Sequence, residues 1–402
     1  MRVLAVCQHY WPEDFQVTAV CEDLAARGHE VTVLAGLPNY PSGVVPPEYR
    51  RGGRRREERG GVRIVRAWEV ARRPGALGLA ANYYSFAHSA KRLARRLGGG
   101  FDVVFAYQLS PVMMAGPAVA YKRMHGVPLL LYCCDLWPES MKVMIGERFR
   151  PLLEHYRRVS KGIYDAADVI AVQSSAFREY FERVHSISGE SVRYIPQFAS
   201  DEYLGEDFSR APSGRVNLVF MGNMGRAQNL PVIVSAFARM RNRARALLHF
   251  VGDGACLGQT KRLAADLGVG EGVVFHGRQP YAQMPRYYRM ADACVLSLAG
   301  DSWVGTTLPS KLQGYMAAGK PVLAAIGGGA RRVIEESGCG AAVAPGDVDG
   351  FASIMDRFAE EPSAFDGCGE RGRAYFAEHF TRSHHVDAIE EALEELARGG
   401  RR

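Results

Sequence analysis

The chain has 402 residues, of which 47% are hydrophobic and 23% are charged. This is a globular composition, and the length exceeds what one hydrophobic core usually fills, so two domains are expected. No run approaches the roughly 18 apolar residues that a membrane-spanning helix needs, and the first residues lack a secretory pattern. The eight cysteines contain no CxxC pair, so we expect a cytoplasmic protein with reduced thiols.

Basic residues gather in the amino-terminal half. Residues 1–200 hold 27 Lys and Arg against 19 Asp and Glu, whereas residues 201–402 hold 23 against 24. This asymmetry predicts that an anionic partner meets the amino-terminal half.

Short β-branched runs alternate with longer amphipathic stretches from the start of the chain. A strand at 2–7, a helix near 17–27 and a strand at 30–35 form a βαβ unit, which indicates a parallel sheet. Further strands are predicted at 102–106, 129–133, 168–172 and 192–195. The first domain therefore covers residues 1–200, and the aperiodic residues 201–214 are interpreted as an interdomain linker.

A second alternating series follows the linker. Its strands are predicted at 216–221, 247–251, 273–276, 293–297, 321–324 and 341–343. Residues 215–380 thus form a second doubly wound α/β domain, and a helix in residues 381–402 is a candidate to pack back on the first. Ligands of such folds bind at the carboxyl ends of the strands, so substrates are expected on the loops facing an interdomain cleft.

Several loops of the second domain have the features of an anion and nucleotide site. The segment LVFMGNMGRAQN places Arg226 at a helix start, and LPSKLQGYMAAGKPVLA opens a helix with Ser310 and Lys311. Free helix amides beside a cation suit a diphosphate. The alternatives are a tight turn with a solvated arginine, and an N-cap serine beside a surface lysine. The candidate donor-site residues are Gly222, Asn223, Gly225, Arg226, Gln228, Asp253, Arg278, Ser310, Lys311 and Gln313.

In the first domain, aromatic and acidic residues follow the strands. HYWPEDFQ and PNYPSG supply Trp11, Phe15, Asn39 and Tyr40, whose rings either stack on a sugar or isoprenoid or fill space beneath a proline-rich loop. CDLWPES brings Asp135 and Glu139 to the same edge, where a carboxylate can orient a hydroxyl or take its proton. Capping of a turn is the alternative role for Asp135.

Ten arginines lie in residues 50–73, ahead of a helical pattern that is apolar first and basic later. This combination favours an anionic membrane surface. A solvated loop beside a core helix is the next interpretation, and nucleic acid is least favoured because no recognised module accompanies the charge. The candidate membrane contacts are Arg72, Arg73, Tyr83, Tyr84, Phe86, Arg95 and Arg96.

Taken together, the motifs resemble the family-4 retaining glycosyltransferases of the GT-B fold, which have two Rossmann-like domains with parallel sheets. The matching stretches are HYWPEDF, RGHEVTVLAGLPNYPSG, DLWPES, FMGNMGRAQNL, FVGDG, HGRQPYAQMPRYYRMADACVLSL, LPSKLQGYMAAGKPVLA and ARRVIEESGCG. Within that family the sequence looks most like bacterial N-acetyl-L-fucosamine transferases of O-antigen and capsule assembly.

The resemblance implies a donor, an acceptor and a location. The second domain would bind a UDP-sugar, an N-acetylated hexosamine or 6-deoxyhexosamine, with the diphosphate held by Arg226 and Lys311. The first domain would hold a polyprenyl-diphosphate-linked saccharide, with Asp135 as the acceptor-side carboxylate. The protein would sit peripherally at the cytoplasmic face of the inner membrane. No cofactor and no metal are expected, and N-capping is the favoured role for the DVD at 347–349.

One departure from the wider family stands out. That family carries two glutamates eight positions apart, where this chain has Thr306 and Gly314. The fucosamine-type branch shares this absence, so we interpret it as a subfamily mark. The alternatives are a transferase with a soluble acceptor, and a UDP-sugar 2-epimerase of the same architecture.

Overall fold

The computed structural model describes residues 1–146, 149–209, 214–300 and 302–400. The chain divides into two compact units: Met1–Gln173, Arg178–Ile195 and Val386–Arg402 form the first, and Ser174–Phe177 with Pro196–His385 the second. The division falls just before Pro196, so the described part of the expected linker clusters with the second unit. Residues 210–213 of that linker lie outside the described residues.

The described part of the first unit holds an eight-stranded sheet in the order β3-β4-β2-β1-β5-β6-β7-β8. Its strands are β1 (Arg2–Val6), β2 (Glu30–Ala35), β3 (Arg56–Arg59), β4 (Val62–Arg66), β5 (Val103–Gln108), β6 (Leu129–Cys133), β7 (Val169–Val172) and β8 (Val192–Tyr194). Every residue of β5 and β6 is buried, as expected where helices cover both faces of a parallel sheet. Strand order reverses between β1 and β5, which locates the ligand-binding crevice of such a sheet.

The β3–β4 hairpin occupies part of the arginine-rich segment and was not predicted from the sequence. Two of its arginines form ion pairs inside the unit: Arg66 is 3% exposed and pairs with Glu57 across the hairpin, and Arg59 binds Glu22. Charged side chains on an edge strand also discourage pairing with another chain. Arg59 and Arg66 of this basic segment therefore have an internal structural role.

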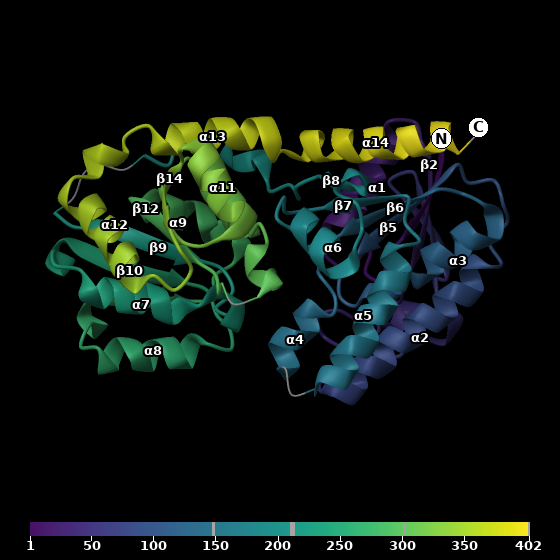
Figure 1. The fold of residues 1–402 in the computed structure, drawn as a ribbon, viewed down its shortest axis with the longest axis horizontal. Helices are drawn as coiled ribbons and strands as arrows, with labels where there is room; N and C mark the ends of the chain where they lie inside the picture. The colour runs from purple at the N-terminus through teal and green to yellow at the C-terminus, as the bar shows by residue number, and fades with distance from the viewer. Residues whose placement is uncertain (147–148, 210–213, 301, 401–402) are drawn as a thin grey trace. The chain divides into compact units, whose positions relative to one another are not determined.

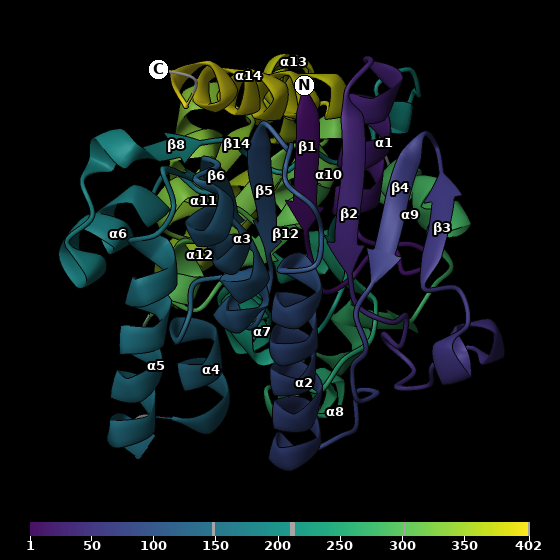
Figure 2. The same ribbon diagram turned by 90° about the vertical axis from the view of Figure 1, so that its right-hand side faces the viewer.

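Helices flank this first sheet. They are α1 (Gln16–Ala26), α2 (Ala76–Ala94), α3 (Gly116–His125), α4 (Glu139–Ile145), α5 (Arg150–Tyr164), α6 (Phe177–His185) and α14 (Arg382–Gly399). Figure 2 shows α2, α4 and α5 extending past the carboxyl ends of the strands. None of the helices in the described ranges is both long and apolar enough to cross a membrane.

The second unit, as far as it is described, holds a six-stranded sheet in the order β11-β10-β9-β12-β13-β14, with every pairing parallel (Figure 1). Its strands are β9 (Val216–Met221), β10 (Ala246–Val251), β11 (Val273–Gly277), β12 (Ala293–Ser297), β13 (Val322–Ala325) and β14 (Gly340–Val343). Its helices are α7 (Leu230–Arg239), α8 (Leu257–Asp266), α9 (Met284–Met290), α10 (Ser310–Ala317), α11 (Gly328–Ser337), α12 (Val348–Glu360) and α13 (Cys368–His379). Here strand order reverses between β9 and β12.

The DVD segment has the structural role that the sequence favoured. Asp347 is the N-cap of α12, and its carboxylate accepts a 2.8 Å hydrogen bond from the amide of Gly350. Asp349 forms an ion pair with Arg239 of α7. Both carboxylates thus have partners within the unit.

The C-terminal helix α14 belongs to the first unit from Val386 onward. Ile389 and Leu393 are fully buried, and Glu390 accepts hydrogen bonds from Arg27 (2.5 Å) and His29 (2.6 Å). Burial alone would raise the pKa of Glu390, but these two bonds outweigh it and the pKa is lowered.

Removing this anchor should weaken the first unit. We expect Glu390→Gln to lower its unfolding free energy at neutral pH by about 1 kcal/mol, the upper range for a partly exposed ion pair. Because the folded-state pKa is lowered, the stabilisation is present above the unfolded value of about 4.3 and disappears as the pH falls through the folded value. Urea denaturation as a function of pH measures both effects.

Glu391 supplies the matched control, since it is the next residue on α14 and its side chain is exposed. Glu391→Gln should leave the denaturation midpoint unchanged. Equal effects of the two substitutions would show that the ion pair contributes nothing specific.

Candidate functional site

The backbones of the loops after β9 and β10 lie so close together that no side chain fits between them at Gly252 or Gly254. A Cβ at Gly252 would lie 2.0 Å from the carbonyl oxygen of Gly222, and one at Gly254 would lie 2.7 Å from the backbone of Met224. The amide of Gly222 also donates to the carbonyl of Val251. Gly222, Gly252 and Gly254 all have positive φ values, so glycine is needed on both conformational and steric grounds.

We call the close approach of Gly222 and Gly252 the glycine junction. The side chain of Lys311, on the first turn of α10, lies across it. A Cβ at Gly222 would lie 2.4 Å from Lys311 Cε, and the lysine Nζ lies 5.7 Å from the Phe220 ring centroid. Burial lowers the pKa of Lys311, and no residue in the described ranges forms an ion pair with its ammonium group. A largely enclosed cation without a counter-charge is costly, and a bound anion would offset that cost.

A hollow of about 470 Å³ opens beside the glycine junction. Residues that follow β10 and β11 form part of its lining. Four of the predicted donor-site residues line it: Gly222, Asn223, Asp253 and Arg278. Its volume is typical of a small-ligand site. Asp253 accepts a hydrogen bond from the amide of Gly254, so its carboxylate helps to fix the loop that forms one wall.

The remaining predicted donor residues divide by role. Arg226 and Ser310 are exposed, and the N-cap of α10 is Pro309, so the Ser310 side chain does not cap this helix. Gln228 accepts a hydrogen bond from the amide of Gly225 and closes the turn. Gln313 requires a correction: it is 1% exposed and its amide donates to the backbone of Gln197, so it supports the fold instead of facing a ligand.

One of the two positions without the family glutamates, Gly314, has a structural explanation. A Cβ at Gly314 would lie 2.9 Å from the hydroxyl of Tyr288, which is buried beneath α10. The Thr306 hydroxyl donates to the Trp303 carbonyl 2.7 Å away. A glutamate at position 314 would collide with the tyrosine, which therefore occupies space that such a side chain needs.

In the first unit, Asp135 follows β6, one strand beyond the reversal point. Its Oδ2 accepts a 3.0 Å hydrogen bond from Ser110, which follows β5, and the Ser110 hydroxyl accepts from the Trp137 indole at 2.9 Å. Burial raises the pKa of Asp135, and the bond from Ser110 opposes that rise. The carboxylate is thus held in one orientation and has an elevated proton affinity.

The second predicted carboxylate is enclosed. Glu139, at the start of α4, is 4% exposed, and its Oε1 lies 3.6 Å from the guanidinium of Arg157 on α5. This arrangement ties α4 to α5. Asp135 is therefore the stronger candidate for contact with a substrate.

The predicted aromatic residues gather around the loops after β1 and β2. Phe15 stacks on His9 with centroids 4.9 Å apart, and Tyr40 lies 5.4 Å from both rings. Tyr40 and Trp11 are 44% and 37% exposed, and the guanidinium of Arg59 covers the Trp11 ring. These two side chains remain accessible to a ligand.

Asn39 requires a different interpretation from the one that the sequence suggested. It is 2% exposed, its Nδ2 donates to Glu69 and its Oδ1 accepts from the amide of Arg72. Glu13 accepts from the amides of Asn39 and Tyr40, each at 2.6 Å. Asn39 therefore shapes the loop from within and does not face a ligand.

Sequence reasoning missed the buried polar network beneath these loops. Glu69 is 2% exposed and accepts hydrogen bonds from Gln8, Asn39 and Asn82. Burial raises the pKa of Glu69 above that of an ordinary glutamate, although these bonds oppose the rise. Its place shortly after β4 was the available signal, but the strand itself had not been predicted.

The predicted membrane contacts are only partly on the surface. Arg73, Tyr84, Arg95 and Arg96 are exposed, and Arg72 donates to the hydroxyl of Tyr83. Phe86 is a correction, because it is fully buried and cannot reach a membrane. Its side chain faces the core from the inner side of α2.

One described group brings three potential metal ligands together: His29, Glu390 and Glu394. It lies at the junction of α14 with the start of β2, where Arg27 already pairs with Glu390. The expectation that the reaction needs no metal stays a prediction.

Comparison with known proteins identifies both halves of the chain. Residues 15–197 match the family described as Glycosyl transferase 4-like domain, and residues 206–375 match Glycosyl transferases group 1. WbjE of Pseudomonas aeruginosa, named as a glycosyltransferase, is 29% identical over 70% of this chain and 72% of its own. WcaI of Escherichia coli K12, named for colanic acid biosynthesis, is 23% identical over 79% and 82%.

Solved structures show the same architecture. HepE from Anabaena, in complex with UDP, matches 98% of this chain and 100% of its own with a TM-score of 0.69 and 16% identity. This similarity establishes the fold, which is the GT-B fold with two Rossmann-like domains. The chain is therefore a glycosyltransferase that joins a glycosyl transferase 4-like domain to a group 1 glycosyl transferase domain.

Proposed function

We propose that the protein transfers an N-acetylated hexosamine or 6-deoxyhexosamine from a UDP-sugar, with retention at the anomeric carbon. The acceptor is a hydroxyl of a polyprenyl-diphosphate-linked saccharide in surface polysaccharide assembly. The largely enclosed cation of Lys311, which has no acidic partner among the described residues, is the observation that carries this proposal. A nucleotide diphosphate supplies the charge that this site lacks, and the site stabilises the charge that develops on it as the sugar leaves.

Different observations support the identity of the nucleobase and the identity of the sugar. Gly222 lines the 470 Å³ hollow and also lies against the side chain of Lys311. The hollow therefore lies close to the lysine, and it has room for a nucleobase and ribose. HepE binds UDP with the same fold, which favours uridine. The small residues at positions 306 and 314, together with Tyr288, favour the branch that resembles N-acetyl-L-fucosamine transferases.

The acceptor belongs to the first unit in this proposal. Asp135, fixed by Ser110, orients the acceptor hydroxyl and takes its proton, while Trp11 and Tyr40 offer aromatic surfaces for a saccharide or isoprenoid. The colanic acid assignment of WcaI supports a polysaccharide pathway. The exposed arginines that flank α2, Arg73, Arg95 and Arg96, support peripheral attachment to an anionic membrane.

A donor and acceptor panel tests the proposal directly. Purified protein is incubated with UDP-, GDP- and dTDP-sugars and a short-chain polyprenyl-diphosphate N-acetylhexosamine, and lipid products are identified by mass spectrometry. A glycosylated lipid formed from one UDP-sugar is the expected result. Transfer from a GDP-sugar would contradict the donor assignment, and UDP-sugar conversion without an acceptor would favour an epimerase.

Lys311→Met tests the diphosphate site while keeping the apolar stem that packs on Gly222. Loss of a charge-assisted contact of about 1.5–3 kcal/mol should weaken UDP binding by roughly 10–100-fold, measured by calorimetry. Because burial penalises the charged amine, the same variant should keep or gain thermal stability without ligand.

Lys261→Met, which removes an exposed lysine from α8, is the control and should bind UDP normally. Unchanged UDP affinity in Lys311→Met would remove this lysine from the donor site. Weaker binding accompanied by lower stability would indicate a packing role.

Asp135→Asn should reduce kcat by about 10²–10⁴ with little change in donor affinity. Because burial raises the pKa of Asp135, and the ionised form is needed, kcat should fall on the acid side at a higher pH than an ordinary aspartate would give. Ser110→Ala removes a bond that lowers this pKa, so it should move the acid limb to still higher pH.

Ser140→Ala is the matched control for the pH profile, because its hydroxyl bonds only the Leu136 carbonyl among the described residues. An acid limb that stays in place in Ser110→Ala would contradict the role of Asp135 as the titrating group.

A further inference from the structure

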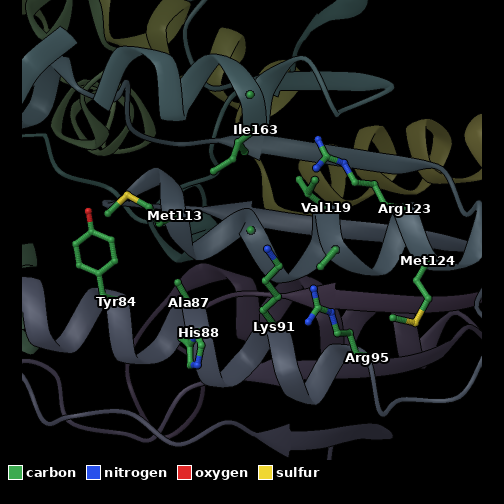
Figure 3. Close-up of a pocket in the computed structure, with 13 residues that line it drawn as sticks. Tyr84, Ala87, His88, Lys91, Arg95, Met113, Val119, Arg123, Met124 and Ile163 are labelled. Carbon is green, nitrogen blue, oxygen red and sulfur yellow. The ribbon is translucent and has the colours of Figure 1, made fainter. Parts of the chain in front are cut away.

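A groove in the first unit is lined by none of the residues assigned above to donor and acceptor. It is a hollow of about 660 Å³ between α2, α3 and α5, and we refer to it as the α2–α3 groove. Its floor is apolar and comes from Met113, Val119, Ala120 and Ile163, each less than 10% exposed. Met113, Val119 and Ile163 are labelled in Figure 3. The volume is typical of sites that enclose one small molecule.

The walls of the groove are cationic. Lys91 and Arg95 point from α2 toward α3, and Arg123 projects from α3 (Figure 3). All three are on the lining, which contains no aspartate or glutamate. None of the three forms an ion pair with a residue in the described ranges. The groove therefore combines an apolar floor with uncompensated positive charge.

This combination fits an anionic amphiphile better than a peptide. The floor offers methyl, methylene and thioether groups with no hydrogen-bonding side chain, so a hydrocarbon chain loses nothing by lying on it, whereas a peptide backbone would leave polar groups unsatisfied. The hydroxyl of Tyr84, at one end, already bonds that of Tyr156 on α5 at 2.8 Å. The charged groups then match a phosphate-bearing head.

We propose that the α2–α3 groove binds a single anionic glycerophospholipid, with an acyl chain on the apolar floor and the phosphate beside Lys91, Arg95 and Arg123. The inference rests on the proposed function for its membrane setting, since the lipid would be drawn from the bilayer to which the protein attaches. Binding itself involves none of the residues assigned above to donor or acceptor, so the two proposals can fail independently.

The test measures lipid binding by the full-length protein in the absence of donor and acceptor. Dioctanoyl phosphatidylglycerol, kept below its critical micelle concentration, is titrated by calorimetry against dioctanoyl phosphatidylcholine and glycerol 3-phosphate. We expect one-to-one binding of the anionic lipid and at least about tenfold weaker binding of both comparison ligands. Equal binding of phosphatidylcholine, or no binding of phosphatidylglycerol, would overturn the proposal.

Two variants of equal charge separate the groove from general surface electrostatics. Lys91→Gln with Arg123→Gln should weaken binding on the order of tenfold or more, whereas Arg92→Gln with Arg158→Gln, exposed on α2 and α5 but outside the lining, should change it less than about twofold. An equal loss of lipid affinity in both double variants would show that general surface charge binds the lipid, and it would overturn the proposal.

Ala87→Trp tests the apolar floor without changing the charge. Ala87 lines the groove from a partly exposed position on α2, so an indole there should fill the trough and abolish lipid binding while UDP affinity and the unfolding midpoint stay unchanged. Retained lipid binding in this variant would overturn the proposal. A panel assay that fails while lipid binding persists would overturn the proposed transferase reaction alone.

Discussion

The largely enclosed amine of Lys311 is the constraint on which the second unit's candidate site depends. Most charges withdrawn from water in proteins are paired, but this one lies against the backbone of Gly222 and has no acidic partner among the described residues. The close approach of Gly222 to Gly252 creates the junction, and Lys311 covers it. In the proposed function, a bound diphosphate would offset the cost of enclosing this cation, so the same interaction would contribute to donor affinity.

In the first unit, by contrast, buried charged side chains have hydrogen-bond partners. Glu13 and Glu69 are enclosed beneath the loops that follow β1, β2 and β4, and their oxygens accept hydrogen bonds from amides and side chains of those loops. Such a satisfied network fixes loop shape and leaves no charge for a ligand. The loops after β1, β2 and β4 are therefore held in shape from within, beside the exposed rings of Trp11 and Tyr40.

The sequence predicted the alternation of strands and helices well, because parallel strands buried on both faces leave strong apolar runs such as LLLYC at β6. It did not predict β3 and β4, since the charged residues of REER resemble a solvated loop until Glu57 is seen pairing with Arg66. At the site, Gly222, Asn223, Asp253 and Arg278 were found from loop position, and they line one hollow. Asn39, Phe86 and Gln313 were misjudged because the direction of a side chain depends on packing partners that are far away in the sequence.

The connection of α14 to the first unit has a consequence for synthesis. Arg27 and Glu390 are 363 positions apart in the chain, and Ile389 and Leu393 complete the apolar contacts of a unit whose sheet ends at β8. On the ribosome, the amino-terminal domain therefore emerges long before its last helix is made, and contacts of such high sequence separation close slowly. The nascent first domain must wait, with part of its apolar surface uncovered, while the entire second domain is translated.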